Sequence, residues 1–589
     1  MCLLPVSFDL LCSHHQPSMT RLSSRDSRFR HSIKPGTCSS CGSSTYDMRF
    51  LLDSLSVLVV IWIAYTLYRR WTRISISDIP GPEPESFLLG SQREALQCQA
   101  GEADFKWQAQ FGHVIRLKGI LGTDHLLISD PKALHYMYSS GYNIRKHAVR
   151  SEITRLATGE GLAWANNDVH KRQRRVNSPA FGTAEARSYV PIFTAYANLA
   201  TKWKECLGVD GSTVVNAPNF FTRYFLDVIG EVAFDYRFGA INDEHDPLST
   251  ALSSITPMLS VPGKSRIFIM GLLEILPVSL IRFFIDYAPF KGFRNGRRVA
   301  RLAKGIAKEL VEEKAEALLA GKSKRDIMSL LVKANASANE RANLSETEML
   351  AQMQTIMLAG HETTATTMSW TLFELTKHPD MQAKLRAEIQ ATESAIHTRG
   401  DTEFTAADFE SMAYTTAVMK EVLRFHPVSY TSLREAARDE ILPLSKPLVT
   451  KSGKTIIELP IAKHTVLVVS LAGYNRNKDV FGEDADKFNP ERWLDGSLQD
   501  KATTKLGVYG NLMTFGSGHR ACIGIQHGHS VYEYQAFLVE LVKNFEFSID
   551  PTLASKIRRE ASLVMVPTIA GEIELGSQLP VTIQAVDSL

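Results

Sequence analysis

A glycine-rich loop around a single cysteine constrains this chain more than any other feature. The segment has the sequence Thr514-Phe-Gly-Ser-Gly-His-Arg-Ala-Cys-Ile-Gly524. Its glycines allow the backbone to turn tightly around the sulfur of Cys522. Backbone N–H groups in such a turn can hydrogen-bond a thiolate and tune its potential. The charge of Arg520 favours the thiolate or binds an anion. The fold must therefore present one cysteine sulfur on an irregular loop.

The cysteine count limits what this loop can do. Of seven cysteines, four lie within the first 41 residues, and only Cys98, Cys206 and Cys522 remain in the rest of the chain. This distribution excludes a disulfide framework and suits a reducing compartment. A lone cysteine is not a zinc finger, which needs three or four N or S ligands. A nucleophilic cysteine would need a partner at a known spacing. One axial thiolate to a haem fits best.

The rest of the chain predicts one large domain. The 589 residues carry 66 basic and 63 acidic side chains, a net charge of +3 that argues against a nucleic-acid binder. A mean hydropathy of −0.09 excludes a polytopic transporter. No linker or repeat interrupts residues 85–585, and helical periodicity dominates. We therefore expect a mainly α fold with small β-sheets, whose size a large buried cofactor helps to explain. Helices are expected over residues 299–319, 346–375 and 379–392, and strands over 113–118, 126–129, 455–459 and 465–470.

One predicted helix is unusually long. Ser345 and Glu348 form a capping box, and the helical pattern continues without proline to about Lys377, roughly 45 Å at 1.5 Å per residue. Five positions share one face, which is mostly small and hydroxylated, namely Ile356, Ala359, Gly360, Thr363 and Thr367. A glycine in mid-helix costs about 1 kcal/mol against alanine. Either a flat group approaches the backbone at Gly360, or another helix packs closely there.

Four motifs together resemble one known family. Phe515 to Gly524 is similar to the haem-binding loop of the cytochrome P450 superfamily. Ala359-Gly-His-Glu-Thr-Thr364 resembles its oxygen-activating helix, and Glu421-Val-Leu-Arg424 resembles its E-x-x-R pair. Phe488-Asn-Pro-Glu-Arg-Trp493 resembles the segment that completes the E-x-x-R cluster. The resemblance covers residues 75–580 and is greatest to fungal microsomal members. It implies a cytochrome P450-like fold.

The resemblance also implies roles for individual residues. Cys522 would be the axial ligand of haem b, and Glu362 and Thr363 would deliver protons during oxygen activation. The remaining cofactor contacts would come from His170, Arg174, Ala359, Gly360, Arg434, Phe515 and Arg520. Of these, the three arginines and His170 would bind the haem propionates. Glu421, Arg424 and Arg492 would form a structural ion-pair cluster; the alternative for Glu421 and Arg424 is a surface salt bridge of little energetic value.

The sequence departs from the family pattern in two places. The family usually has tryptophan where this chain has His170, whose imidazole can still donate a hydrogen bond to a propionate. After Cys522, residues 525–529 delay Glu533 by about two positions and place His527 and His529 beside the loop. If this insertion is real, the packing below the haem changes.

The N-terminal region predicts a membrane anchor. Residues 50–68 are largely apolar and would span roughly 28 Å as a helix, and Arg69, Arg70 and Arg73 follow at once. We expect residues 48–73 to be a transmembrane anchor with a basic flank, residues 74–85 a Pro-rich hinge, and residues 86–585 the catalytic domain. A buried core helix is the alternative. Residues 1–47 form an N-terminal extension, and translation can start at Met1 or at Met48. The charge asymmetry predicts a single-pass protein of the endoplasmic reticulum with a cytosolic catalytic domain.

These features predict a haem-thiolate monooxygenase that oxidises a lipophilic substrate in secondary metabolism or xenobiotic oxidation. The chain has no flavin or dinucleotide fingerprint, so electrons from NADPH must arrive through a P450 reductase, with cytochrome b5 as a further candidate donor. Lys171, Arg172 and Arg175 form a basic patch suited to an acidic redox partner. Substrate contacts are expected from residues 144–164, 258–293, 356–367 and 428–433. The alternatives are a haem-thiolate isomerase or dehydratase acting on a peroxide, and a haem-binding gas sensor. The substrate and the oligomeric state stay open.

Overall fold

A computed structural model describes most of the chain beyond the predicted anchor. The described residues are 74–242, 262–321, 325–337, 343–496, 498, 504–525 and 528–586, together with five isolated positions between residues 57 and 68. Chain contacts divide the protein into residues 1–73 and residues 74–589. The second of these units, called the body below, carries all the elements discussed here.

Helices make up most of the body. The α-helices are α2 (Gln92–Gln97), α3 (Glu102–Phe111), α4 (Pro131–Ser139), α5 (Ala148–Thr158), α6 (Asn167–Asn177), α7 (Thr183–Ser188), α8 (Val190–Ala197), α9 (Ala217–Phe234), α12 (Lys264–Glu274), α13 (Val278–Tyr287), α14 (Lys291–Leu319), α15 (Ile327–Ser337), α16 (Glu346–Lys377), α17 (Pro379–Thr398), α18 (Ala406–Ser411), α19 (Ala413–Phe425), α20 (Leu471–Asn475), α21 (Lys478–Phe481), α22 (His529–Asn544) and α23 (Pro551–Ala554). The short 3-10 helices are η1 (Ile120–Gly122), η2 (Ser178–Phe181), η3 (Asn198–Cys206), η4 (Pro490–Trp493), η5 (Met513–Phe515), η6 (Gly518–Arg520) and η7 (Ile573–Leu575).

The strands form four small sheets. They are β1 (Val114–Lys118), β2 (Asp124–Ile128), β3 (Ile144–Lys146), β4 (Ser212–Asn216), β5 (Thr431–Ala436), β6 (Glu440–Val449), β7 (Thr455–Ile461), β8 (Val466–Ser470), β9 (Phe545–Ser548), β10 (Ile557–Ala561), β11 (Met565–Ile569) and β12 (Pro580–Ala585). The largest sheet has the order β1-β2-β8-β5-β3, with β2 and β8 parallel and the other pairs antiparallel. Its last pair sets Lys146 opposite Arg434. The smaller sheets are β4-β12-β9, β6-β7 and β10-β11.

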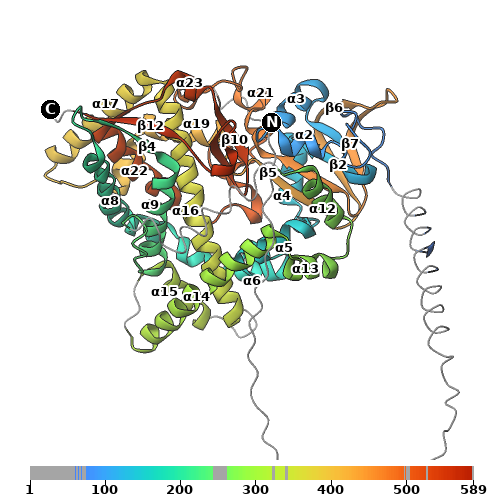
Figure 1. Cartoon of the computed structure of the whole chain (residues 1–589), viewed down its shortest axis with the longest axis horizontal. Coiled ribbons are helices and arrows are strands. Elements are labelled where there is room, and N and C mark those ends of the chain that lie inside the picture. The colour runs from blue at the N-terminus through green and yellow to red at the C-terminus, as the bar shows by residue number, and fades with distance from the viewer. Residues whose placement is uncertain are drawn as a thin grey trace, which may run out of the picture. The chain divides into compact units, whose positions relative to one another are not determined.

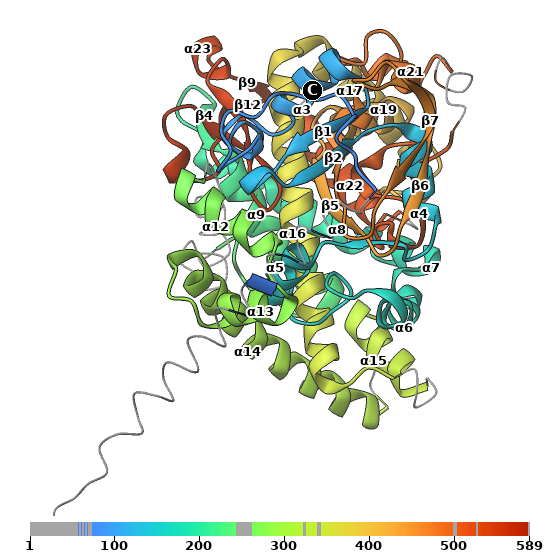
Figure 2. The same cartoon turned by 90° about the vertical axis from the view of Figure 1, so that its right-hand side faces the viewer.

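The long helix α16 runs through the middle of the body in both views (Figures 1 and 2). Its capping box is present: Glu348 N–H donates to Ser345 Oγ at 3.2 Å, and Ser345 N–H donates to Glu348 Oε2 at 3.0 Å. Residues 364–375 are buried without a break, so this part of the helix is core on all sides. The helix packs closely along α9, and Figure 1 shows the five-stranded sheet on the side away from α8 and α9.

The structure confirms the predicted mainly α fold with small sheets. The predicted helices correspond to α14, α16 and α17, and the predicted strands to β1, β2, β7 and β8. The predicted anchor, the first 47 residues and their cysteines lie outside the described residues, apart from the five isolated positions. Among the described residues, no helix combines the length and apolar character that crossing a membrane requires. The transmembrane helix therefore stays a prediction.

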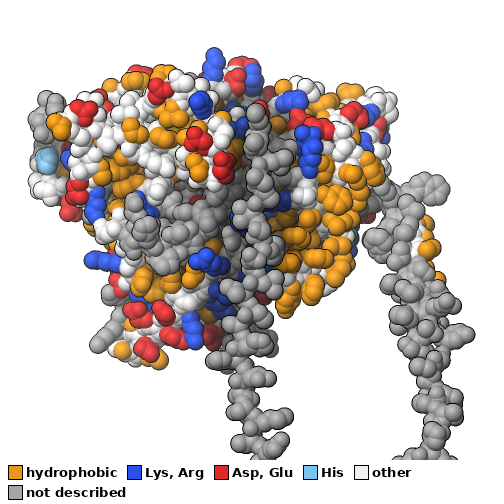
Figure 3. Space-filling model, viewed as in Figure 1, with side chains coloured by type: hydrophobic (Ala, Val, Ile, Leu, Met, Phe, Trp, Pro, Cys, Tyr) orange, Lys and Arg blue, Asp and Glu red, His pale blue; other side chains and the backbone are white. Residues whose placement is uncertain are grey.

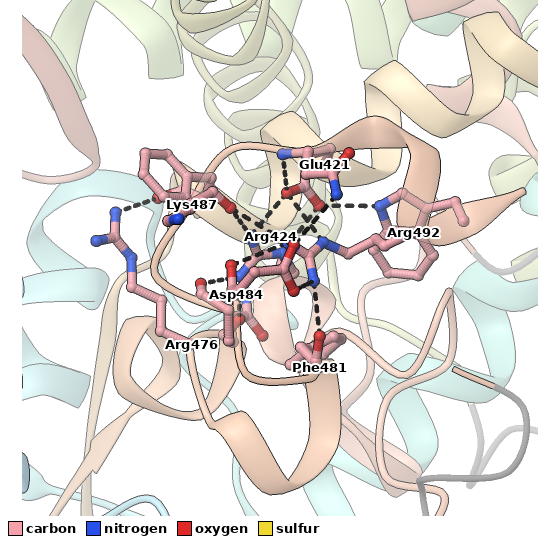
Figure 4. Close-up of polar contacts among 12 residues, drawn as sticks. Glu421, Arg424, Arg476, Phe481, Asp484, Lys487 and Arg492 are labelled. Atoms are coloured by element: carbon pink, nitrogen blue, oxygen red, sulfur yellow. Dashed lines mark hydrogen bonds and ion pairs between the residues drawn. The ribbon is translucent and has the colours of Figure 1, made fainter. Parts of the chain in front are cut away.

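The helix α19 and the segment after α20 are joined by a buried ionic cluster (Figure 4). Glu421 and Arg424 are both fully buried, and Arg424 donates from Nε and Nη2 to the two carboxylate oxygens of Glu421 at 2.9 and 2.7 Å. Arg492 adds a third contact, from Nε to Glu421 Oε1 at 3.2 Å. The surface salt bridge that the sequence left open is therefore excluded, and the three predicted residues meet in the core.

The cluster holds more than its own charges. Arg424 also donates to the carbonyls of Asn475, Ala485 and Lys487, and Arg492 donates to Asp484. Buried charges cost several kcal/mol unless such bonds satisfy them. The same Asn475 accepts from the N–H of Met513 at 2.9 Å and donates to Thr514 Oγ1 at 2.8 Å. The cluster thus reaches the start of the cysteine loop.

Candidate active site

A cavity of about 400 Å³ lies between α16 and the cysteine loop. Its walls come from segments far apart in the chain: α16, the loop of residues 514–525, the start of α22, β5 with the residues before it, and the end of α6 with η2. The residues that matter below are Leu162, Asn177, Phe181, Ile229, Gln352, Ile356, Ala359, Gly360, Thr363, Thr367, Val428, Arg434, Phe515, Arg520, Cys522, His529, Glu533 and Val564. The sequence motifs around Cys522 and Thr363 therefore face one space.

The cysteine loop folds tightly through its glycines. The N–H of Cys522 donates to the carbonyl of Phe515 at 2.8 Å and closes the turn. Gly516 and Gly518 have φ of 66° and 59°, a region that other residues rarely adopt. At Gly518 a Cβ would also lie 2.3 Å from the carbonyl oxygen of Tyr138 at the end of α4. Gly518 thus allows the loop to approach the end of α4 closely.

The Cys522 side chain opens onto the cavity. Removal of the sulfur from bulk water raises the pKa of its thiol above the ordinary value, while the N–H groups of Gly524 and Ile525 and the charge of Arg174 act in the opposite direction. A thiol must lose its proton before it binds a metal. These two N–H groups would stabilise the resulting thiolate, as the sequence predicts for this loop.

All five residues predicted to share one face of α16 line the cavity. The hydroxyl of Thr363 donates to the carbonyl of Ala359 at 2.8 Å, which leaves its lone pairs toward the open space. Gly360 has a second role. A Cβ at this position would lie 2.6 Å from Cγ1 and Cδ1 of Ile229 on α9. Close helix packing is therefore sufficient to require this glycine, and a flat group approaching the backbone is not needed to explain it.

Glu362, the other predicted proton donor, does not line the cavity. Its side chain is partly buried, and burial raises the pKa of its carboxyl to about 7. A carboxyl with this pKa can hold or release a proton near neutral pH. Glu362 thus has the chemistry of a proton carrier, and it is next to Thr363 in the sequence without lining the cavity itself.

The predicted cations gather at one edge of the cavity. Arg434 and Arg520 line it, and Arg174 donates to the carbonyl of Ala521 at 2.8 Å, one residue before the cysteine. Burial and the nearby charge of Arg434 lower the pKa of Arg520 to about 10. An anion bound between these like charges would relieve their mutual repulsion. The edge is therefore built to receive negative charge.

Orphaned donors at this edge fit the carboxylates of a haem. Arg520 Nε and His519 Nε2 are buried and have no hydrogen-bond partner among the described residues. His170 is buried near them, and its Nδ1 is bonded to the hydroxyl of Tyr142 at 2.8 Å. A haem carries two propionates that would satisfy such donors. The carboxylate edge of the haem would be held by Arg434, Arg520 and His519, with Arg174 and His170 next to them.

Several residues of the site were not singled out from the sequence. Lys146 is partly buried near the cations and donates from Nζ to the carbonyls of Leu162, Ala163 and Ala165. Asn177 and Phe181 line the cavity just after the helix that carries His170 and Arg174, so their position along the chain was a usable signal. Tyr142 and Ile229 had none, because no periodicity or motif marks them.

The extra residues after Cys522 are absorbed before α22. Gln526 and His527 lie outside the described residues. Gly528, with φ of 91°, precedes α22, and His529 packs edge-on against Tyr189 and Phe193. Glu533 is still delivered into the core, where it accepts from Thr364 Oγ1 at 3.0 Å. Burial raises the pKa of the Glu533 carboxyl to about 8. The insertion thus leaves a direct link between α22 and α16.

Two expectations about surrounding segments were wrong. No described residue of 258–293 lines the cavity, because α12 and α13 pack with α5 around a small separate core of Val149, Leu273, Ile281 and Ile285. The basic patch is also smaller than expected. Arg172 donates from Nη1 to Glu348 Oε2 at 2.9 Å and to the carbonyl of Asn343 at 2.7 Å, so its charge is used at the start of α16.

Comparisons with known proteins agree with this geometry. The model of the family described as Cytochrome P450 matches residues 80–575. "Cytochrome P450 monooxygenase claP" of Ampulloclitocybe clavipes is 31% identical over 555 residues, which cover 91% of this chain and 98% of the relative. "Cytochrome P450 monooxygenase 205" of Postia placenta (strain ATCC 44394 / Madison 698-R) is 30% identical over 547 residues, 90% of this chain and 97% of the relative.

Gly360→Ala tests whether helix packing requires this glycine. We expect a loss of about 1 kcal/mol or more in unfolding free energy, because overpacking costs 1–3 kcal/mol and outweighs the helix propensity of alanine. In an Ile229→Ala background the same change should become neutral or stabilising. Urea midpoints at constant slope measure both. Gly305→Ala in α14 is the control, since a Cβ there meets nothing within 4 Å. If Gly360→Ala behaves like Gly305→Ala, packing does not require Gly360.

Proposed function

The chain belongs to the cytochrome P450 family and is a haem-thiolate monooxygenase, and from this premise we propose that it oxidises a lipophilic organic substrate at a membrane, with electrons from NADPH. The observation that carries the proposal is the single cavity onto which Cys522, the small face of α16 and the cationic edge all open. Substrate, electron donor and membrane are argued in turn below.

Haem b is the proposed cofactor. When bound through a thiolate it supplies the reduction and cleavage of O2. Cys522 would provide the thiolate, and the N–H groups of Gly524 and Ile525 would stabilise its charge. Arg434 and Arg520 would hold the carboxylates. Phe515, which lines the same side of the cavity, would pack against the haem and limit the access of water to the sulfur.

Thr363 and Glu362 are proposed to manage protons on the opposite wall. Thr363 commits its hydrogen to the carbonyl of Ala359, so its oxygen faces the cavity as an acceptor and can hold a water or a hydroxyl group. Glu362 lies next to it with a pKa of about 7 and can supply the proton that such a water passes on. This arrangement favours oxygen activation over the isomerase alternative, which needs no proton delivery.

The proposed substrate is lipophilic because the walls that no cofactor motif accounts for are mainly apolar. Leu162, Ile229, Ile356, Val428 and Val564 supply this surface. The relatives are monooxygenases of fungi, and the proposed place of this chain is in secondary metabolism or xenobiotic oxidation. Comparison of the metabolites of a deletion strain with those of its parent would identify the substrate. Accumulation of no new compound under any growth condition would argue against a biosynthetic role.

The proposed electron donor is a separate NADPH-dependent reductase, with cytochrome b5 as a second candidate. Lys171 and Arg175 are exposed on α6, the helix that also carries His170 and Arg174. A short exposed basic surface beside the cofactor edge suits an acidic partner. Turnover with NADPH that does not depend on added reductase would contradict this part of the proposal.

The proposed membrane contact adds a surface of the body to the predicted anchor. Figure 3 shows hydrophobic side chains gathered over the region of α12 and α13. The exposed members of this apolar patch are Ile275, Val278, Leu280, Phe283, Phe284, Tyr287 and Phe290. An exposed apolar surface of this kind suits a bilayer interface. With residues 50–68 as the span, the body would lie on the cytosolic face of the endoplasmic reticulum.

Cys522→Ser tests the proposed ligand. The reduced, CO-bound wild type should show the red-shifted Soret band of thiolate ligation, and the variant should lack it, because a hydroxyl is a poorer electron donor than a thiolate. Some haem can remain bound through the cationic edge. Cys206→Ser is the matched control, since Cys206 is an exposed free cysteine. An unchanged spectrum in Cys522→Ser would remove Cys522 as the ligand.

Thr363→Ala tests proton management. The helix should tolerate the change, since alanine is the better helix former, so haem content should stay near the wild-type value. Reductase-supported NADPH use should continue while the ratio of product to NADPH falls severalfold and hydrogen peroxide rises. Ser369→Ala, which removes a buried hydroxyl that donates to the carbonyl of Ala365 on the same helix and does not line the cavity, should leave coupling unchanged. Unchanged coupling in Thr363→Ala, with substrate bound, would favour the isomerase alternative.

Carbonate extraction tests the two membrane contacts. Chains that start at Met1 or Met48 should stay in the membrane pellet at high pH, because both keep the predicted span. A chain that starts at Ile74 should be extracted by carbonate but sediment with membranes at neutral pH through the apolar patch. Phe283→Asn with Phe284→Asn should reduce that sedimentation, whereas Ile441→Asn with Ile457→Asn, exposed on the β6–β7 hairpin, should not. Extraction of the Met48 form would refute the anchor, and abundant native peptides from residues 1–47 would refute a start at Met48.

A further inference from the structure

Tyr142 connects three segments that meet at the cationic edge of the cavity. It lies between α4 and β3, and its hydroxyl is 2.8 Å from Nδ1 of His170 on α6. Its ring lies 4.4 Å from the ring of His519 and 4.9 Å from the guanidinium carbon of Arg520, both in the cysteine loop. One side chain thus contacts the groups that flank the edge from two directions.

The hydrogen bond between Tyr142 and His170 can run in either direction, depending on the tautomer of the imidazole. A phenol oxygen is a weaker acceptor than an imidazole nitrogen, so donation from the hydroxyl to Nδ1 is favoured. Burial raises the pKa of the Tyr142 hydroxyl, so the phenol stays protonated. Burial and the nearby charges of Arg520 and Lys146 lower the pKa of His170 to about 3, so the imidazole is neutral. A neutral imidazole that accepts at Nδ1 carries its hydrogen on Nε2.

The Nε2–H of His170 has no acceptor within the described ranges. The His170 side chain is 96% buried, but Nε2 keeps a little exposed surface, beside the fully buried and unpartnered Arg520 Nε and His519 Nε2. An N–H at this position can reach an acceptor that is bound at the same edge. Arg174 lies one turn further along α6, directed to the carbonyl of Ala521.

We propose that Tyr142 is a positioning residue for the haem: it locks His170 as the Nε2–H tautomer and holds that N–H as a donor to a haem carboxylate. The inference rests on the haem-thiolate assignment made above and adds a residue to it. Without the hydroxyl, the imidazole would be free to place its hydrogen on Nδ1 and turn a lone pair toward the carboxylate. That arrangement replaces an attraction by a repulsion.

The exchange of tryptophan for histidine explains why such a lock is needed. An indole has a single N–H and no acceptor nitrogen, so a tryptophan at position 170 has only one way to meet a carboxylate. An imidazole has two tautomers and needs a second partner to select one. Tyr142 supplies that partner in this chain. The hydroxyl should therefore matter only while residue 170 is histidine.

The experiment is a double-mutant cycle on haem loss. Transfer of haem from the purified full-length holoprotein to apomyoglobin gives the rate, and the CO spectrum reports the thiolate separately. Tyr142→Phe should accelerate haem loss roughly tenfold, the factor that corresponds to one hydrogen bond of about 1.4 kcal/mol. The Soret position should not change. Tyr136→Phe is the matched control, because it removes a tyrosine hydroxyl that donates to Glu440 and not to His170.

The second half of the cycle separates positioning from packing. In His170→Trp and in His170→Phe, Tyr142→Phe should change the rate of haem loss less than twofold, because neither side chain has a tautomer to lock. An equal acceleration in these backgrounds would mean that the hydroxyl only supports packing. No acceleration in the wild-type background would refute the proposal outright. Loss of the thiolate Soret band in the wild type itself would instead refute the haem-thiolate assignment.

Discussion

The buried pair of Glu421 and Arg424 is the interaction on which the position of the cysteine depends. Both side chains have no exposed surface, and their remaining donors and acceptors are directed to the backbone after α20 and to Arg492. Removal of one partner from such a pair typically costs 3–5 kcal/mol, because the other charge is left buried. Asn475, whose carbonyl binds Arg424, is also hydrogen-bonded through its side chain to Met513 and Thr514. The position of the loop that carries Cys522 thus depends on a cluster of buried charges rather than on a sheet or a helix.

The opposite edge of the loop depends on charge in a different way. Arg434, Arg520 and Lys146 lie close together, and burial lowers the pKa of both Lys146 and Arg520. Each of two neighbouring cations raises the free-energy cost of burying the other's charge, and the unpartnered Nε of Arg520 adds a further cost. A group with two carboxylates would relieve all of these costs at once. The site is therefore expected to gain stability from its cofactor, in addition to catalytic power.

Sequence patterns within one segment correctly predicted those parts of the site that are formed by that segment alone. The capping box at Ser345 and the 3.6-residue period placed the wall of the cavity on α16 correctly, and three glycines marked the turn at Cys522. Contacts between distant segments had no such signal. Ile229 opposite Gly360, Tyr142 opposite His170 and Glu348 opposite Arg172 are each ordinary residues in their own sequence context. Only the folded chain shows that the basic residue Arg172 serves a helix terminus and not a partner surface.

The hydroxyl groups of α16 explain how one helix can be both core and cavity wall. Thr363, Thr367 and Thr371 each donate to the carbonyl four residues earlier at 2.8 Å. Such bonds satisfy the hydroxyls within the helix, so they need no partner across the cavity or in the core. Side chains of this kind stay small, which lets α9 approach at Gly360 and leaves room for a cofactor beside Thr363. Burying these hydroxyls therefore destabilises the core little. A threonine hydroxyl can take part in chemistry only where the cavity leaves one of its lone pairs accessible.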